Sequence, residues 1–472
     1  MSGAAVVWFR RDLRLHDHAG LAEAAARGQA VIPLYIDDDG DVGDWRPGAA
    51  SRWWLHHSLD SLGAALSARG SQLLLRRGDA CQVLIDVARS CGADCVYFQR
   101  RSEPAARANE QRVERGLAAE GIAVVPSNAG LFFTPDQIAT GQGNPYQVFT
   151  PFWKRCLQEK LDDAVVRVPE HWDAVDSTPA SMKLDELDLL PKLDWAGGLR
   201  VQWQPGEDGA RALLRDFAAG TVDRYSRGRD LPAEAWTSRL SPHLHFGEIS
   251  PRQVAAALRA VPGEGQESFL RELGWREFAH HLLYHFPHVD KAPLRGQFAR
   301  FPWCDDPQGL RAWQRGQTGY PLVDAGMRQL WHTGWMHNRV RMVVASFLIK
   351  DLLIDWRRGA EWFWDTLVDA DLANNSMGWQ WVAGCGADAA PFFRIFNPIS
   401  QGEKFDPEGV YVKRWVPELA QVPARFIHAP WRAPDHVLRA SGVVLGTDYP
   451  EPIVDHAFAR ERALAALQKI KA

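Results

Sequence analysis

The chain has 472 residues, of which 46% are apolar and 24% are charged, and its formal net charge is −4. This length exceeds one ordinary hydrophobic core and predicts two or three domains, and the composition excludes a disordered chain. Charge is unevenly spread: residues 157–195 carry ten acidic against four basic side chains, so the remainder has a small positive balance. That balance permits a basic groove for nucleic acid without establishing one.

Cysteine usage and hydropathy indicate the compartment. The six cysteines lack the spacing of a disulfide framework, and no CxxC occurs, so we expect reduced thiols and no structural zinc. The first apolar run, AAVVWF, begins almost at once, and no run is long enough to cross a bilayer. We therefore expect a cytoplasmic protein without a leader peptide or a membrane span.

Residues 1–130 alternate between short β-rich runs and helical patterns. The runs are AAVVWF, AVIPLYI (30–36), SQLLL (71–75), CVYF (95–98) and GIAVV (121–125). This alternation predicts βαβ units, hence a parallel, Rossmann-like α/β domain. The first run is followed by WFRRDLRLHDH and not by GxGxxG, so an ordinary dinucleotide fingerprint is missing. The pairs Arg10–Arg11 and His56–His57 are interpreted as surface features.

Residues 131–200 form an acidic, proline-containing stretch that predicts a long linker, and residues 201–472 show the apolar periodicity of an all-helical domain. Within the helical part, Thr237, Ser238 and Ser241 surround Arg239. Hydroxyls and free N–H groups at a helix start suit a phosphate, but a plain N-cap is the commoner meaning of such residues.

Two further spacings have modest interpretations. Glu272 and Arg276 are four residues apart, as in an ordinary helical pair. His281 and His285 share that spacing, but Leu282 stands where a zinc protease would carry glutamate, so solvated or core histidines are favoured over metal ligands.

Tryptophan is unusually abundant, with 21 residues, and recurs among Asn, Arg and Asp between residues 331 and 398. Aromatic side chains alone serve a core, but polar groups buried beside them require partners. A large flat ligand with polar edges explains both the abundance of tryptophan and the polar residues among the tryptophans.

An ordered series of motifs then identifies a family. TSRLSP, WREF, TGYPLVDAGMRQL, TGWMHNRVRM, DLLIDWRRG, DADLANN, GWQW and FRIFNP resemble the photolyase/cryptochrome family, and closest are microbial class I cyclobutane pyrimidine dimer photolyases. The resemblance extends from residue 6 to about 420. It implies an antenna-binding N-terminal domain and a helical domain that holds FAD.

The resemblance implies a set of flavin-binding positions. These are Tyr225, Thr237, Ser238, Arg239, Leu240, Ser241, Glu272, Arg276, Asn338, Arg341, Asp369, Asp371 and Asn375. Asp369 would pair with Arg341, and Asp371 would accept from the N–H edge of the ring. Asn375 matches the residue that faces flavin N5, where plant cryptochromes carry Asp and animal ones usually Cys. It therefore favours a repair enzyme. Phe269 departs from the family pattern, because a tryptophan occurs there in the closest relatives.

The implied activity is light-driven electron transfer from reduced FAD to a flipped-out pyrimidine dimer in damaged DNA. Trp275 and Trp381 match stacking residues, while Glu272, Asn338, Met342 and Arg394 match other dimer contacts. Photolyases that act on six-four photoproducts carry histidines at the positions of Asn338 and Met342, so cyclobutane dimers are favoured.

Two accessory features follow from the same resemblance. Trp379, Trp356 and Trp303 match the indoles that carry electrons to the flavin, although each alone would suit a core. Asn109, Glu110 and Lys291 match positions that bind a methenyltetrahydrofolate antenna, and 8-hydroxy-5-deazaflavin is the alternative antenna.

Two other functions remain open at this stage. One is a blue-light-sensing cryptochrome without repair activity, against which Asn375 and the lack of a long C-terminal tail weigh. The other is a dark flavin oxidoreductase, which would need an open route for a small substrate. We expect a monomer whose affinity for DNA falls as salt rises.

Overall fold

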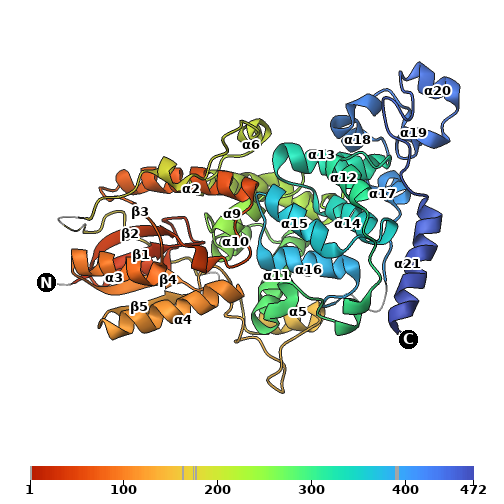
Figure 1. The fold of residues 1–472 in the computed structure, drawn as a ribbon. Coiled ribbons are helices and arrows are strands. Elements are labelled where there is room, and N and C mark those ends of the chain that lie inside the picture. Colours follow the sequence, from red (N-terminus) through yellow and green to blue (C-terminus); the bar gives the residue numbers. More distant parts are fainter. Residues whose placement is uncertain (1–2, 162–163, 174, 176–177, 389–392, 472) are drawn as a thin grey trace. The chain divides into compact units, whose positions relative to one another are not determined.

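The computed structural model describes residues 3–161, 164–173, 175, 178–388 and 393–471. Contacts divide the chain into two compact units (Figure 1). Unit 1 comprises residues 1–223, 238–287 and 368–373, and unit 2 comprises residues 224–237, 288–367 and 374–472. The units group segments that are distant in sequence, and the division at residues 130 and 200 stays a prediction.

Unit 1 contains one five-stranded parallel sheet with the order β3-β2-β1-β4-β5. The strands are β1 (Ala4–Phe9), β2 (Ala30–Asp37), β3 (Leu74–Arg77), β4 (Ala93–Gln99) and β5 (Ala123–Ser127). All six residues of β1 are buried, as expected for a central strand covered on both faces. The order reverses between β1 and β4, and in such sheets ligands bind beyond the carboxyl ends of the strands.

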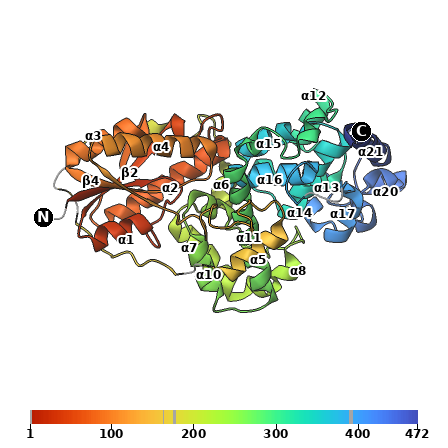
Figure 2. The ribbon, with the colours of Figure 1, turned by 90° about the horizontal axis from the view of Figure 1, so that it is seen from below.

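Helices cover both faces of the sheet (Figure 2). In unit 1 the helices are α1 (Ala19–Ala26), α2 (Ala49–Ser67), α3 (Ala80–Cys91), α4 (Pro104–Ala119), α5 (Phe149–Gln158), α6 (Gly197–Gln202), α7 (Glu207–Asp216), α9 (Ser241–Phe246), α10 (Pro251–Leu258) and α11 (Glu264–His285). Local signals set their ends: Asp79 accepts from Gln82 N–H (2.9 Å) at the start of α3, and Gly92, with φ +65°, ends it.

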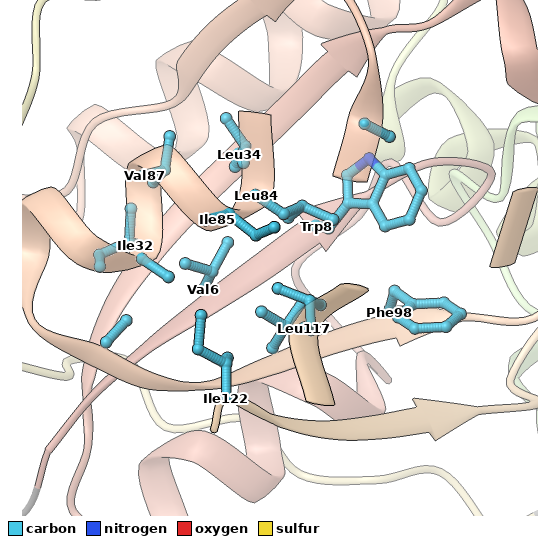
Figure 3. Close-up of a cluster of buried hydrophobic side chains, with 14 of the residues drawn as sticks. Val6, Trp8, Ile32, Leu34, Leu84, Ile85, Val87, Phe98, Leu117 and Ile122 are labelled. Atoms are coloured by element: carbon cyan, nitrogen blue, oxygen red, sulfur yellow. The ribbon is translucent and has the colours of Figure 1, made fainter. Parts of the chain in front are cut away.

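The core of this domain lies between the sheet and helices α3 and α4 (Figure 3). Val6 and Trp8 of β1 and Phe98 of β4 face Leu84 of α3 and Leu117 of α4. On the opposite face, Gly20 of α1 approaches Tyr97 so closely that a Cβ would lie 2.9 Å from that side chain. The predicted parallel α/β domain is confirmed.

The segment after α5 binds back to the sheet by main-chain hydrogen bonds. Val31 N–H donates to Asp173 O (2.8 Å), and Met182 N–H donates to Leu75 O (3.1 Å). Leu75 N–H also donates to Ser181 Oγ (2.9 Å). This segment therefore occupies hydrogen-bonding groups of β2 and β3 that no neighbouring strand fills.

Unit 2 is helical, and the only β-feature among its described residues is an isolated bridge between Leu445 and Tyr449. Its helices are α8 (Tyr225–Gly228), α12 (Pro307–Arg315), α13 (Pro321–Thr333), α14 (Asn338–Ser346), α15 (Trp356–Thr366), α16 (Leu372–Ala383), α17 (Pro398–Phe405), α18 (Val410–Trp415), α19 (Ala424–Ile427), α20 (Asp435–Ala440) and α21 (His456–Lys471). The first two residues of α16 belong to unit 1. The predicted helical character is confirmed.

Candidate functional site

From Ser238 onward the predicted phosphate cradle belongs to unit 1 and is a tight turn into helix α9. Arg239 adopts the left-handed region with φ +54°, which is uncommon for a residue with a Cβ. Leu240 N–H donates to Ser238 Oγ (3.3 Å), and no side chain caps the start of α9. Ser241 Oγ donates to Asp369 Oδ2 (2.6 Å). The hydroxyls therefore fix the turn and one predicted flavin carboxylate, and the plain N-cap interpretation is not what the structure shows.

Asp371, also in unit 1, is buried beside two histidines. Its Oδ2 lies 3.5 Å from His245 Nδ1 and 3.6 Å from His280 Nε2. Burial opposes ionisation, but His280, His245 and Arg276 hold the pKa of Asp371 well below its usual range. Burial lowers the pKa of His245 to about 4. The cluster thus maintains an anion in a dry setting, as required of an acceptor for a ring N–H.

A cavity of about 30 Å³ lies against this cluster. Its lining includes Glu103, Gly130, His245, Arg276, His280 and Asp371. Among the described residues, His245 Nε2 and both ring nitrogens of His280 lack a hydrogen-bond partner. Buried polar atoms normally have one, so the cavity suits a water molecule or a ligand edge.

Helix α11 carries three further candidates. Arg276 Nη1 donates to Gly130 O (2.8 Å), and Glu272 and Trp275 are half-buried. The indole of Trp275 stacks on Phe149, with ring centroids 3.7 Å apart and planes inclined by 8°. Phe269, the departure from the family pattern, packs against Phe217 at 4.7 Å.

His281 and His285 on the same helix both have ring nitrogens 3.0 Å from Pro135 O, so they hold a loop. Among the residues that the structure describes, no group of three or more His, Cys, Asp or Glu side chains is placed to hold a metal ion.

In unit 2, helix α14 presents Asn338, Arg341 and Met342. Asn338 is exposed, while Arg341 and Met342 are half-buried. His337 caps the helix, because its Nδ1 accepts from Arg339 N–H (3.2 Å). Arg341 Nε donates to Met336 O (2.8 Å). The backbone before the helix thus holds the guanidinium of Arg341 through Met336 O.

Helix α16 carries Asn375 and Trp381, and Arg394 follows it in the chain. Asn375 Nδ2 donates to Ala360 O (3.0 Å), which holds its amide. The guanidinium carbon of Arg394 lies 4.9 Å from the ring centroid of Trp381. Tyr225 of unit 2 is buried, and the guanidinium carbon of Arg229 lies 5.6 Å from its ring centroid. Thr237 ends the first segment of this unit and is half-buried.

The three predicted relay indoles all belong to unit 2. Trp379 and Trp356 are buried, at 3% and 2% exposure, and Trp303 is half-buried. The indole of Trp379 contacts Phe363 (5.0 Å between centroids) and Trp313 (6.2 Å). Sequence patterns did not single out Trp313, because one indole in an amphipathic helix looks like any core residue.

A second, larger cavity of about 660 Å³ lies at the carboxyl ends of the strands in unit 1. Its lining includes Arg10, Arg11, Tyr35, Asp38, Asp41, Arg77, Arg101 and Leu187. The interpretation of Arg10 as a surface feature is wrong: it is 5% exposed, and it binds Asp41, Glu110 and Gln99 O. Its place directly after a buried strand was the signal available in the sequence.

Two of the three predicted antenna residues, Asn109 and Glu110, stand behind this cavity. Asn109 Nδ2 donates to Asp38 Oδ2 (2.8 Å), and Glu110 accepts from Arg101 N–H (2.9 Å). Both are buried, so the structure brings them together as supports for the lining. Lys291 is an exposed residue of unit 2. Burial opposes ionisation of Asp41, but Arg10 and Arg101 keep its pKa low.

Both parts of the chain match known protein families. Residues 5–171 match the family described as DNA photolyase, and residues 269–469 match the FAD binding domain of DNA photolyase. A deoxyribodipyrimidine photo-lyase of Agrobacterium fabrum is 49% identical over 99% of this chain and 98% of its own length. The chain belongs to the photolyase/cryptochrome family.

Other members of the photolyase/cryptochrome family show its range. Cryptochrome-1 of Arabidopsis thaliana is 40% identical, over 99% of this chain and 70% of its own length. A crystal structure of a bacterial class III photolyase from Agrobacterium tumefaciens matches with a TM-score of 0.95 at 48% identity, covering 100% of this chain and 98% of that one. The predicted fold class is thereby confirmed. No helix among the described residues is long and apolar enough to span a bilayer.

Proposed function

We propose that this protein repairs cyclobutane pyrimidine dimers in DNA under light, as a deoxyribodipyrimidine photo-lyase. The observation that carries the proposal is the likeness to a photo-lyase over nearly the full length of both chains, at 49% identity. The side chains agree with it. The neutral amide of Asn375 is oriented by Ala360 O, and Asn338 and Met342 take the positions of the histidines that six-four repair requires.

FAD fits the chemistry of the donors and acceptors, and when bound and reduced it would supply the light-driven electron. The chain's own contribution is orientation and charge. Asp371 would accept from a ring N–H, since its carboxyl stays ionised in its buried cluster. Asn375 would present its neutral amide to a ring nitrogen, protonated or unprotonated, with one amide N–H already held by Ala360 O. Tyr225, Thr237, Ser238, Arg239, Leu240, Ser241, Glu272, Arg276, Asn338, Arg341 and Asp369 complete the proposed set.

The dimer would be read by aromatic planes and a few polar groups. Trp381, with Arg394 lying over it, offers a stacking surface with a cationic edge, and Trp275 offers a second plane. Glu272, Asn338 and Met342 would contact the base edges. Trp379, Trp356 and Trp303 would return reducing equivalents to the cofactor, with half-buried Trp303 at the solvent end. We retain the proposals of a monomer and of a cytoplasmic location.

We also propose that the 660 Å³ cavity of unit 1 holds the antenna. Its position at the carboxyl ends of parallel strands is the general ligand position of such sheets. Methenyltetrahydrofolate and 8-hydroxy-5-deazaflavin remain the two candidates. Asn109 and Glu110 would act on either one through Asp38, Asp41 and Arg10.

The subclass is where the motifs and the comparisons differ. The motif series resembles class I enzymes, whereas the similar crystal structure is that of a class III photolyase. Because that likeness covers the entire chain, we propose class III.

The test is repair of ultraviolet-irradiated oligothymidylate by chemically reduced protein with bound FAD, under blue light and in darkness. Light-dependent recovery of thymine absorbance is expected, and Asn375→Asp, which introduces the residue of plant cryptochromes, should weaken it. No recovery in light would contradict the proposal. It would favour the second candidate, a light-sensing cryptochrome, which the 40% identity to a plant cryptochrome supports.

A further inference from the structure

Lys350 is a lysine with no access to solvent. It lies at 0% exposure in the π-helical turn Phe347–Asp351 that continues α14. Its Nζ donates to Ala383 O (3.4 Å) and lies 2.9 Å from the centroid of the Phe393 ring. Among the described residues, no carboxylate pairs with this amine. Single π-turns within helices occur frequently at functional sites.

The surroundings of Lys350 are unfavourable to an ammonium ion. Burial lowers the pKa of Lys350 well below its usual range, and among the described residues the nearby thiol of Cys385 opposes this shift. The carboxylate of the adjacent residue, Asp351, is bound to His456 of α21. A methionine of similar length would occupy the same space without a polar atom to desolvate. Positions that break such a rule are expected at functional sites.

The contacts of the amine point to what it orders. Ala383 is the last residue of α16, two residues after Trp381, and carbonyls at a helix end need partners. Phe393 directly precedes Arg394, whose guanidinium lies over Trp381. The π-turn itself follows α14, which presents Asn338 and Met342. The amine of Lys350 thus contacts both segments that carry Trp381 and Arg394. Lys350 itself lies in the turn that continues α14, the helix that carries Asn338 and Met342.

We propose that Lys350 is a positioning residue that holds Trp381 and Arg394 in register for the damaged bases. This role rests on the proposed function, because Trp381 and Arg394 were assigned to the dimer there. The amine acts through the Ala383 carbonyl and the Phe393 ring and does not itself touch DNA. Replacing it should disturb recognition of the lesion while leaving the fold intact or more stable.

The test compares Lys350→Met with the wild type and with Lys469→Met, which removes an exposed lysine of α21. Each FAD-loaded protein is titrated in darkness with a fluorescent oligonucleotide with or without one thymine dimer, and its thermal midpoint is measured. Lys350→Met should raise the Kd for damaged DNA about tenfold, as loss of an ordered contact does. Its Kd for undamaged DNA should stay unchanged and its thermal midpoint should rise. Lys469→Met should change neither preference nor midpoint.

Saturating the variant with damaged DNA provides a second readout. Repair per bound complex should match the wild type, so that the loss appears in KM and not in kcat. A parallel fall in affinity for both DNAs with a lower midpoint would show that Lys350 only supports the core. Unchanged preference would also overturn its role. A wild-type protein that binds both DNAs equally would instead contradict the proposed function itself.

Discussion

Polar side chains are held in different ways at the sheet-edge cavity of unit 1 and around helices α14 and α16 of unit 2. At the sheet edge, charges neutralise one another: Arg10 and Arg101 both meet Asp41, and each also meets a glutamate. In the helices, single neutral or cationic groups are held by main-chain carbonyls, as for Asn375, Arg341 and Lys350. The wall of the cavity is therefore held by paired side-chain charges, whereas these helices hold single side chains through the backbone.

The largest expected effect is on the charged wall. Arg10→Ala should lower the free energy of unfolding by ~3–5 kcal/mol, because it breaks the buried ion pair with Glu110 and removes one of the two arginines that pair with Asp41. Arg77→Ala is the control, since the Arg77–Asp37 pair is 43% and 37% exposed and should contribute no more than about 1 kcal/mol. Urea unfolding measures both, and equal losses would remove the distinction between the wall and an ordinary surface pair.

Glu277 of α11 is a buried carboxylate with one cationic neighbour among the described residues, Arg276. Its Oε2 accepts from Phe132 N–H (3.0 Å), Arg276 lies 3.7 Å away, and burial raises its pKa to about 7. Because the folded pKa lies above the unfolded value, its stabilising contribution is complete below about pH 4.5 and is lost as pH rises through 7. Glu277→Gln should therefore abolish a decline of up to about 3 kcal/mol between these pH values. Unfolding measured from pH 4 to 8 decides this, and an unchanged slope in the variant would contradict it.

Trp303 offers a smaller, kinetic effect in unit 2. Trp303→Phe should slow photoreduction of the oxidised protein about tenfold, equivalent to ~1.4 kcal/mol, because phenyl is oxidised less readily than indole. Repair by chemically reduced protein should be spared. Trp313→Phe is the matched control, since this indole also lies near Trp379 but is not one of the three predicted relay positions. Equal loss of photoreduction and repair would contradict the relay assignment.

The smallest effect concerns the cap of α14. His337→Ala should cost about 1 kcal/mol of stability by removing the bond from Arg339 N–H, whereas His337→Asn should retain it. Thermal unfolding of both variants gives the comparison. If both variants lose the same stability, the cap does not hold the helix that presents Asn338.

Much of the fold was predictable because the signals were local. Continuous apolar runs between helical patterns marked β1 to β5, and only the bounds shifted, as where SQLLL became Leu74–Arg77. The family motifs predicted roles for Asn375, Trp381 and Arg394, and these roles stay predictions. Contacts between residues that lie far apart in the chain could not be predicted from the sequence. The residues next to Arg10 and Lys350 in the chain do not indicate that Glu110 and Phe393 become their partners. Arg10 was therefore interpreted as exposed, and Lys350 was not recognised as buried.

The main-chain bonds from the segment around Asp173 and Met182 to β2 and β3 have a consequence for handling the protein. A protease nick there would remove no proposed site residue, yet release of the segment would leave Val31 N–H of β2 and Leu75 O of β3 without their partners. Such an edge recruits strands from other molecules. A nicked preparation should therefore be recognised first by turbidity and oligomer formation, while the bound cofactor and its colour are still present.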